Sequence, residues 1–355
     1  MPISKIAGKA LTVLGPVDPK ELGVTLTHEH LTIDHVKANF TEPKDSADRE
    51  LAYKPVSYEI LHWLRYNRTE NKDNLKLPEE KKIIAEAMYF KRAGGGTIVE
   101  VTNRGINRDP KALVRISKAT GLNIVMGSGY YLATSHPADM DKKAEEEITQ
   151  EIVRDVTEGV NGTGVKAGLI GEIGCVWPLK DNERKSLIAA AKAQALTGAP
   201  LNVHPGRKRD AVFEAVGILK DAGADLSRVV ISHVDIRVRD HQGRVDLAKT
   251  GCYLEYDNVG WEGPRPVTLN WDPAIDIPTD ELRVKEIRQL IEAGFLKQIV
   301  LSTDVCMKVH LRQYGGHGYD HIQKYFVPLM LTLGMTREQI DTILIENPRR
   351  MLTFV

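Results

Sequence analysis

Two histidines separated by one residue, His28 and His30, follow a largely apolar run that begins at Leu22. Residues two apart in a β-strand project from the same face, so both imidazoles would point one way and Glu29 the other. Neutral imidazole is a common ligand of transition-metal ions. The motif indicates a metal site at a strand end; taken alone, it is equally compatible with two hydrogen-bonded histidines.

Further side chains with the same chemistry end other apolar segments of the chain. They are Glu172, His204, His233 and Asp304. Each has a simpler explanation by itself: His204 alone is better read as a buried hydrogen-bonded histidine, and Asp304 as a helix cap. Together with the first two histidines they make six candidates. One catalytic zinc takes three protein ligands, so six favour two ions about 3.5–4 Å apart that share a carboxylate and a hydroxide.

The elements that position these residues follow a regular order, in which short apolar segments alternate with amphipathic ones. The apolar segments predict eight strands, at residues 22–30, 97–102, 123–127, 167–174, 200–204, 228–233, 252–256 and 298–303. Strict alternation of strand and helix predicts a parallel sheet, and eight units predict a closed (β/α)8 TIM barrel. The alternative is an open doubly wound sheet, which is disfavoured because no Gly-x-Gly-x-x-Gly turn follows a strand.

Barrel strands all end at one rim, where active sites are built, so the six candidates should meet there. We expect a single domain over residues 1–355, with a small hairpin within residues 2–20. Helices are predicted at residues 79–93, 110–120, 142–158, 182–197, 211–221, 240–249, 279–293, 322–333 and 337–346. Residues 31–80, with a helical patch at 57–66, form a long connection that predicts a packed lid or an interface.

The composition excludes several classes of protein. Lys+Arg and Asp+Glu both number 48 in 355 residues, so the net charge is zero and no nucleic-acid or membrane surface is indicated. The cysteines are Cys175, Cys252 and Cys306, which are too few and too scattered for a disulfide framework and read as packing residues. The N-terminus lacks a sustained apolar segment. We expect a soluble cytoplasmic protein with a small-molecule substrate.

The order of the candidates resembles that of the amidohydrolase superfamily, most closely its phosphotriesterase branch. The shared pattern is His-x-His after strand one, an acidic or modified-lysine bridge on strand four, histidines on five and six, and aspartate on eight. Asn347-Pro348 resembles the closing Asn-Pro motif of that superfamily. One departure is informative: phosphotriesterases and related lactonases use a carboxylated lysine where this chain has Glu172. Glutamate at this position is typical of the animal phosphotriesterase-related subgroup and of bacterial phosphotriesterase homology proteins.

The resemblance implies a ligand set and a reaction. His28, His30, Glu172 and Asp304 would hold the more buried ion, and Glu172, His204 and His233 the other, with zinc as the default metal. A hydroxide shared by the ions would attack a carbonyl carbon, and Asp304 would carry its proton to the leaving nitrogen. The animal subgroup is associated with hydrolysis of the amide bond of N-acetyltaurine to taurine and acetate, which is the leading prediction. The alternatives are a lactonase or phosphotriesterase that uses the same ions, and a catalytically inactive metal-binding scaffold. Members of that branch are often homodimers.

Substrate contacts are expected from the rim loops. The candidates are Tyr130, Tyr131, Arg207, Arg237 and Lys308, because a sulfonate needs cationic or N–H donors; for each charge the alternative is a solvated surface position. Asp235 is expected to hold Arg237, and Glu29 either to orient a ligand ring or to form a salt bridge. The glycine-rich loop at residues 305–325 could fold over the pocket, and its His310 and His317 are not expected to be ligands.

Overall fold

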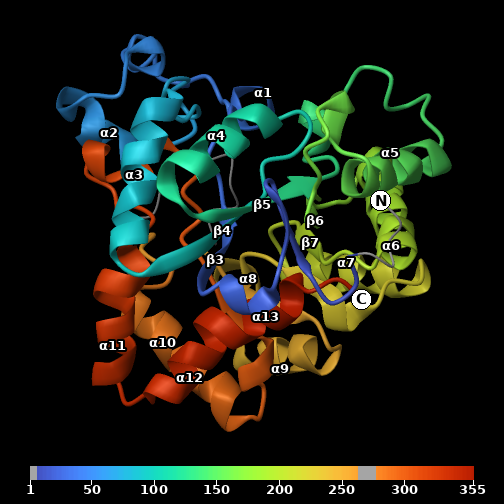
Figure 1. The fold of residues 1–355 in the computed structure, drawn as a ribbon. Helices are drawn as coiled ribbons and strands as arrows, with labels where there is room; N and C mark the ends of the chain where they lie inside the picture. The colour runs from blue at the N-terminus through green and yellow to red at the C-terminus, as the bar shows by residue number, and fades with distance from the viewer. Residues whose placement is uncertain (1–5, 263–276) are drawn as a thin grey trace.

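Eight parallel strands form the centre of the protein in a computed structural model, which describes residues 6–262 and 277–355 (Figure 1). In chain order they are β3 (Val24–Glu29), β4 (Gly95–Glu100), β5 (Asn123–Ser128), β6 (Leu169–Gly174), β7 (Leu201–His204), β8 (Val229–Ile231), β9 (Tyr253–Tyr256) and β10 (Ile299–Leu301). Each strand pairs with the next along the chain in a parallel register. The eight predicted strands are therefore confirmed.

The two edges of this sheet meet. The Thr27 hydroxyl of β3 donates to the Leu301 carbonyl of β10 over 3.1 Å, and the His28 amide donates to the Ser302 hydroxyl over 2.9 Å. These bonds bring the first strand against the last and produce a nearly closed barrel. The predicted (β/α)8 TIM barrel is confirmed, and its carboxyl-terminal rim gathers residues from every part of the chain.

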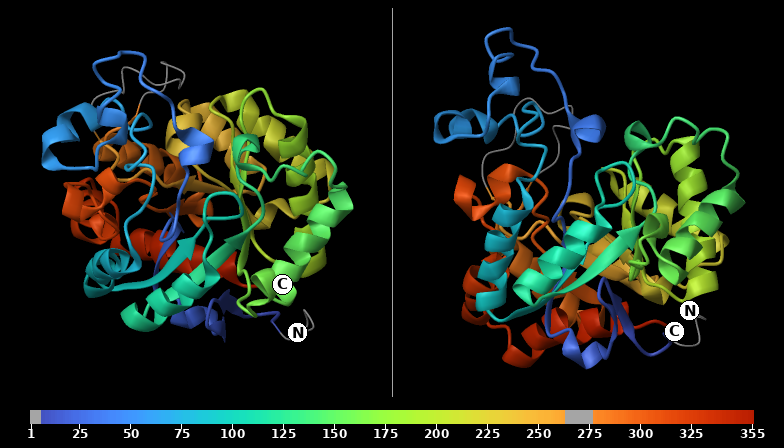
Figure 2. Two further views of the ribbon diagram at one scale, coloured as in Figure 1. Left: turned by 90° about the horizontal axis from the view of Figure 1, so that it is seen from above. Right: turned by 45° about the horizontal axis from the view of Figure 1, so that its top comes forward.

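Helices surround the barrel, as the view from above in Figure 2 shows. They are α3 (Glu80–Arg92), α4 (Pro110–Thr120), α5 (Glu145–Thr157), α6 (Asp181–Thr197), α7 (Arg209–Asp221), α8 (Val234–Arg237), α9 (His241–Lys249), α10 (Asp280–Glu292), α11 (Val327–Thr332), α12 (Arg337–Asp341) and α13 (Asn347–Leu352). The predicted helices are confirmed with small shifts at their ends. After β10, single π-helical turns at Ile322–Phe326 and Thr342–Glu346 lead into α11 and α13.

Local sequence explains why these elements begin and end where they do. The Asp109 carboxylate accepts hydrogen bonds from the amides of Lys111 and Ala112, and Pro110 occupies the first helical position of α4. Gly121 ends that helix with φ +65°, a conformation that glycine adopts at little cost. The strands are runs of buried Val, Ile and Leu because helices cover the barrel on one side and packed side chains fill the other.

The predicted hairpin consists of β1 (Ala10–Thr12) and antiparallel β2 (Gly15–Val17); residues 2–5 of the predicted range lie outside the described residues. The amide of Val13 donates to the carbonyl of Ile124, near the start of β5. The hairpin therefore lies at the end of the barrel opposite the rim.

The long connection after β3 forms a lid with its own short helices, α1 (Val36–Asn39) and α2 (Leu61–Leu64). In the right-hand view of Figure 2 it rises above the barrel, far from both termini. The amide of Lys308 donates to the Asn74 carbonyl over 3.0 Å, so the lid packs against the loop that follows β10. The prediction of a packed lid is confirmed.

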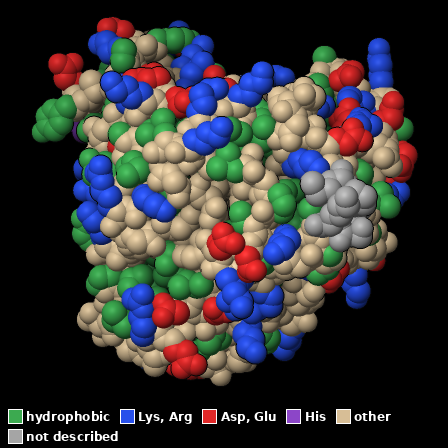
Figure 3. Space-filling model, viewed as in Figure 1, with side chains coloured by type: hydrophobic (Ala, Val, Ile, Leu, Met, Phe, Trp, Pro, Cys, Tyr) green, Lys and Arg blue, Asp and Glu red, His purple; other side chains and the backbone are tan. Residues whose placement is uncertain are grey.

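The surface agrees with the balanced composition. On the face shown in Figure 3, basic and acidic side chains are interspersed. Among the described residues, no helix combines the length and the apolar character needed to cross a bilayer.

The Asn-Pro motif has a structural role that can be tested. The buried Asn347 amide donates to the carbonyls of Leu296 and Ile299 over 2.8 and 2.7 Å, next to β10. Asn347→Ala leaves both carbonyls without this partner, so we expect urea unfolding to give a free energy lower by about 1–3 kcal/mol. Arg337→Ala, which removes an exposed ion pair with Asp341, should change it by about 0–1 kcal/mol. Equal effects would contradict the role of Asn347.

Candidate metal centre

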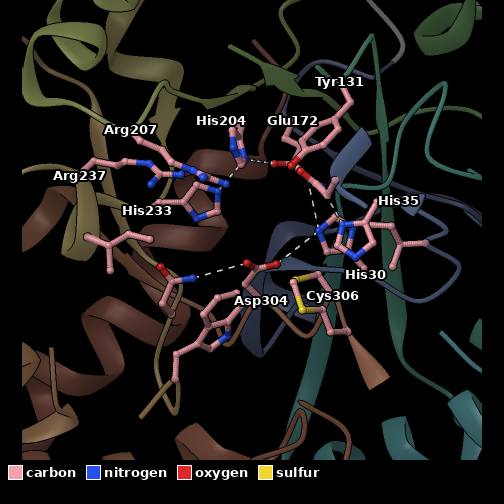
Figure 4. A pocket seen from close by; sticks show the side chains of 16 residues that line it. His30, His35, Tyr131, Glu172, His204, Arg207, His233, Arg237, Asp304 and Cys306 are labelled. Atoms are coloured by element: carbon pink, nitrogen blue, oxygen red, sulfur yellow. Dashed lines mark hydrogen bonds and ion pairs between the residues drawn. The ribbon is translucent and has the colours of Figure 1, made fainter. Parts of the chain in front are cut away.

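The six predicted ligands meet at the carboxyl-terminal rim of the barrel. Candidate ligand atoms of His28, His30 and Asp304 all lie within 4.8 Å of one another, and so do those of Glu172, His204 and His233. Figure 4 shows most of these side chains around one pocket. The predicted convergence is found, and its division into two groups matches the two expected ion positions.

Glu172 lies between the two groups. One of its oxygens is 3.4 Å from Nε2 of His30, and the other is 2.9 Å from Nδ1 of His204 and 3.6 Å from Nε2 of His28. Nε2 of His30 also lies 3.4 Å from Asp304. The carboxylate thus has the position of a bridge, with one oxygen available to each group (Figure 4).

Three histidines are held from behind, through Nδ1. The partners are Glu255 for His28 at 3.0 Å, Asp257 for His233 at 2.8 Å, and the Thr102 hydroxyl for His30 at 2.8 Å. Such contacts fix the ring and leave Nε2 directed at the centre, as metal-binding histidines require. Nε2 of His28 is fully buried and has no hydrogen-bond partner among the described residues. A cation would satisfy this nitrogen, so the residues fit a metal.

Sequence reasoning missed Glu255 and Asp257. A signal was present: the two acidic residues are two apart at the end of the seventh strand, where a shared face points to the rim. Both are fully buried. Asp257 also forms a third group of potential ligands with His28 and His233.

The prediction for Glu29 was wrong, since this residue neither orients a ligand ring nor forms a salt bridge among the described residues. Its carboxylate accepts hydrogen bonds from the hydroxyls of Ser302 and Thr303 and from the amides of Thr303 and Val305, over 2.6–2.8 Å. These bonds hold the backbone on both sides of Asp304, which has φ +43°. A non-glycine residue in that region is uncommon and is often found at functional sites. Glu29 therefore positions Asp304.

Burial controls protonation within the cluster. It raises the pKa of Glu172 to about 8 and that of Asp304 to about 7, despite the favourable charge of His28. Burial also lowers the pKa of His204 and His233, so their rings stay neutral. Carboxylates that resist ionisation and imidazoles that resist protonation both become effective ligands when a cation is present.

The cluster faces a pocket with a void of about 50 Å³. Three predicted substrate residues, Tyr131, Arg207 and Arg237, line it (Figure 4). The Tyr131 ring stands edge-on to the ring of His204, with centroids 5.2 Å apart. Burial lowers the pKa of Arg207 to about 9 and of Arg237 to about 10, and both remain cationic at neutral pH.

The neighbours of Arg237 differ from the prediction. Asp235 accepts from Nε of Arg283 over 2.8 Å, so the expected Asp235–Arg237 pair was wrong. Arg237 is 6% exposed, and its Nε and Nη1 have no hydrogen-bond partner among the described residues. The buried guanidinium therefore retains donors for a ligand in the pocket.

Two other predicted contacts lie elsewhere. The Tyr130 hydroxyl is bonded to Glu151 and accepts from Arg104, away from the pocket lining. The Lys308 ammonium donates to Asp73 of the lid over 2.5 Å, so this residue joins two loops and does not reach the pocket. Neither Tyr130 nor Lys308 lines the pocket, and of the two tyrosines, one of which was expected to border the substrate, Tyr131 does.

Several pocket residues were not foreseen in that role, including His35, Asn258 and Trp261. Their positions depend on loop conformation, and no local motif marks them. The three cysteines are free and buried, as predicted, but Cys306 also borders the pocket. His310 and His317 belong to none of the three groups of potential ligands within the described residues, in agreement with the prediction.

Comparison with known proteins agrees with this geometry. The sequence model of the Phosphotriesterase family matches residues 8–352. The chain belongs to the phosphotriesterase family. Its complete set of buried potential ligands fits membership of a family of metal-dependent hydrolases, which is the class of enzyme assigned here.

Relatives match over their full length. A phosphotriesterase-related protein of Nematostella vectensis is 46% identical over 353 residues, covering 98% of this chain and 99% of that protein. The N-acetyltaurine hydrolase of Xenopus tropicalis is 43% identical, covering 99% of this chain and 100% of its own. The crystal structure of a resiniferatoxin-binding protein from Rhodobacter sphaeroides superposes with a TM-score of 0.92 at 38% identity, covering 97% of this chain and 95% of that one.

The buried carboxyl groups predict how the metal-free protein responds to pH. Glu172 and Asp304 hold protons in the folded state that the unfolded chain releases, because their folded pKa values lie above the ordinary ones. Stability is therefore lost as pH rises toward 8. The lowered pKa values of His204 and His233 act mainly below pH 6.5, and the raised pKa of His28, caused by the neighbouring carboxylates, adds to the loss of stability as pH rises.

We expect the melting temperature of chelator-treated protein to fall between pH 6.5 and 8. The metal-loaded protein should fall less, because bound cations favour the ionised carboxylates. Differential scanning fluorimetry across this range tests the prediction. A metal-free melting temperature that rises with pH would contradict it.

Proposed function

We propose that this protein is a binuclear metal-dependent amidase that hydrolyses N-acetyltaurine to taurine and acetate. The observation that carries the proposal is the juxtaposition, in one pocket, of two groups of potential ligands with the buried guanidinium of Arg237. The groups of potential ligands provide for metal-assisted hydrolysis, and the guanidinium provides for binding of an anionic substrate. Relatives that carry the name N-acetyltaurine hydrolase support this combination.

The two groups would each hold one divalent ion, with Glu172 shared between them. Two ions bound there would supply Lewis acidity, which activates a water and polarises the substrate carbonyl. Imidazole and carboxylate ligands suit zinc as the default ion. Glu255, Asp257 and Thr102 would hold the histidine rings in their orientations throughout turnover.

Asp304 is the residue proposed to move the proton. Its carboxylate lines the pocket, and burial places its pKa at about 7, where it can accept and return a proton near neutral pH. Proton delivery to nitrogen is needed because an amine is a poor leaving group. Glu29 would keep the carboxylate in place through the backbone of the residues on either side.

Arg237 and Arg207 are proposed to bind the sulfonate. A planar guanidinium matches the geometry of oxyanions, and desolvation strengthens such a charged hydrogen bond. Both side chains lie on the His204–His233 side of the pocket, and Asp304 lies on the other (Figure 4). A substrate whose sulfonate is bound by the arginines would thus place its amide between the arginines and Asp304.

A lactonase or a phosphotriesterase could use the same ligands, so a substrate panel is the direct test. Purified metal-loaded protein is assayed with N-acetyltaurine, a lactone and paraoxon, with and without a chelator. We expect kcat/KM to be highest for N-acetyltaurine and to vanish on chelation. Faster turnover of the lactone or paraoxon, or turnover that survives chelation, would refute the proposal.

Removal of a proposed ligand should remove both the metal and the activity. For His28→Ala and Glu172→Ala we expect metal content, measured by elemental analysis, to fall and turnover to drop by at least about 10²-fold, because Glu172 is shared by both proposed ion positions and His28 belongs to one of them. Glu281→Gln, which changes an exposed carboxylate on α10, is the control. Unchanged turnover in either ligand variant would refute the metal assignment.

The sulfonate contact predicts a charge-specific defect. For Arg237→Met we expect KM for N-acetyltaurine to rise by about tenfold or more, the loss expected for one charged hydrogen bond. The rise for N-propylacetamide, an uncharged amide of similar length, should be smaller. Arg209→Met, which changes an exposed arginine, is the control. Equal effects on the two amides would exclude a role in binding the sulfonate.

A further inference from the structure

A second cavity lies under the lid, beside the metal pocket. Its volume is about 960 Å³, and lid residues 56–68 and loop residues 309–317 contribute to its lining. Trp261 borders both this cavity and the metal pocket. Its indole donates to the Thr303 carbonyl over 2.9 Å, which fixes the ring as a wall between the two spaces.

The guanidinium of Arg68 is the unusual feature of this cavity. Arg68 is 9% exposed, lines the cavity, and lies 5.5 Å above the ring of Trp261. Across residues 6–262 and 277–355, its guanidinium takes part in no hydrogen bond or ion pair. Burial of an unpaired cation has a large desolvation cost, so such a group usually binds an anionic partner.

The described residues around Arg68 do not supply that partner. Glu262 also lines the cavity, but its carboxylate accepts from the amide of Asp280 over 2.8 Å. Burial lowers the pKa of His310 and His317, and the charge of Arg68 lowers them further. Both rings are therefore neutral, and Nε2 of His310 has no hydrogen-bond partner among the described residues. A cation and two neutral imidazole rings thus line the same cavity.

Apolar side chains form part of the remaining lining. They include Val56, Leu61, Leu64, Val309 and Tyr314. A cavity of this size can hold a small organic molecule, and apolar contacts combined with a few polar groups are the usual design of such a site. An inorganic ion would leave the apolar wall uncovered.

We infer that this cavity binds an organic anion with an apolar body, whose sulfonate or carboxylate pairs with Arg68. The site is separate from the metal ligands and does not depend on the function proposed above. Trp261 would contact the ligands of both spaces, one on each side of its ring.

Octanesulfonate is a suitable probe, because it combines an alkyl chain with a single anionic group. Calorimetric titration of the metal-loaded protein, below the micellar concentration, should show a site whose affinity depends on Arg68. We expect Arg68→Met to raise the dissociation constant about tenfold or more, and Arg68→Lys to retain part of the affinity. 1-Octanol should bind the wild-type protein more weakly than octanesulfonate does.

Two control variants separate this cavity from other cationic surfaces. Arg65→Met changes an exposed arginine of the same lining, and Arg237→Met removes a guanidinium of the metal pocket. Neither should alter the affinity by more than about twofold. Loss of binding in Arg237→Met with full binding in Arg68→Met would place the probe at the metal pocket and overturn the inference, as would equal affinities for octanol and octanesulfonate.

A stability measurement provides a second readout. Without ligand, Arg68→Met should melt close to the wild type, because the removal of a buried charge and the loss of its contact with Trp261 oppose each other. Octanesulfonate should raise the melting temperature of the wild type and of Arg65→Met, but not that of Arg68→Met. A melting temperature that rises equally in all three would overturn the inference.

Discussion

The site depends on the burial of the Glu172 carboxylate among histidine side chains. Its carboxylate is fully enclosed by His28, His30 and His204, and burial opposes its ionisation. Glu255 and Asp257 lie just behind these rings and add further buried acid. Positive charge within this cluster would favour the ionised carboxylates, and the divalent ions proposed above would supply it. Such ions would couple charge balance within the barrel to catalysis.

The barrel makes this concentration of charge possible. Hydrogen bonds close β3 (Val24–Glu29) against β10 (Ile299–Leu301), so side chains distant in sequence meet without any loop having to carry them. This is why the sequence was sufficient to predict which side chains meet at the rim. A strand fixes the face of each side chain by its alternation, and a barrel fixes the rim at which strands end. His28, His204 and Asp304 could be located from these two rules and the order of the chain.

The errors have a common physical origin in the loops. Lys308 and Arg237 follow a strand by similar distances, yet the first pairs with Asp73 of the lid while the second points into the pocket. A cationic side chain forms a structural ion pair only if a segment distant in sequence places an acidic side chain beside it. The spacing of residues along the chain does not predict this partner. Glu29 shows the same limitation, because its partners are backbone amides that no side-chain pattern reveals.

Unsatisfied groups distinguish the functional cations from the structural ones. Arg283 is fully buried and paired with Asp235 and Asp280, as expected of a charge that stabilises the fold. Arg237 and Arg68 are almost as buried, yet Nε and Nη1 of Arg237 have no hydrogen-bond partner among the described residues, and the guanidinium of Arg68 lies over the ring of Trp261. A protein gains no stability from such groups. Their retention on both sides of Trp261 is best explained by anionic ligands that complete the hydrogen bonds the fold leaves open.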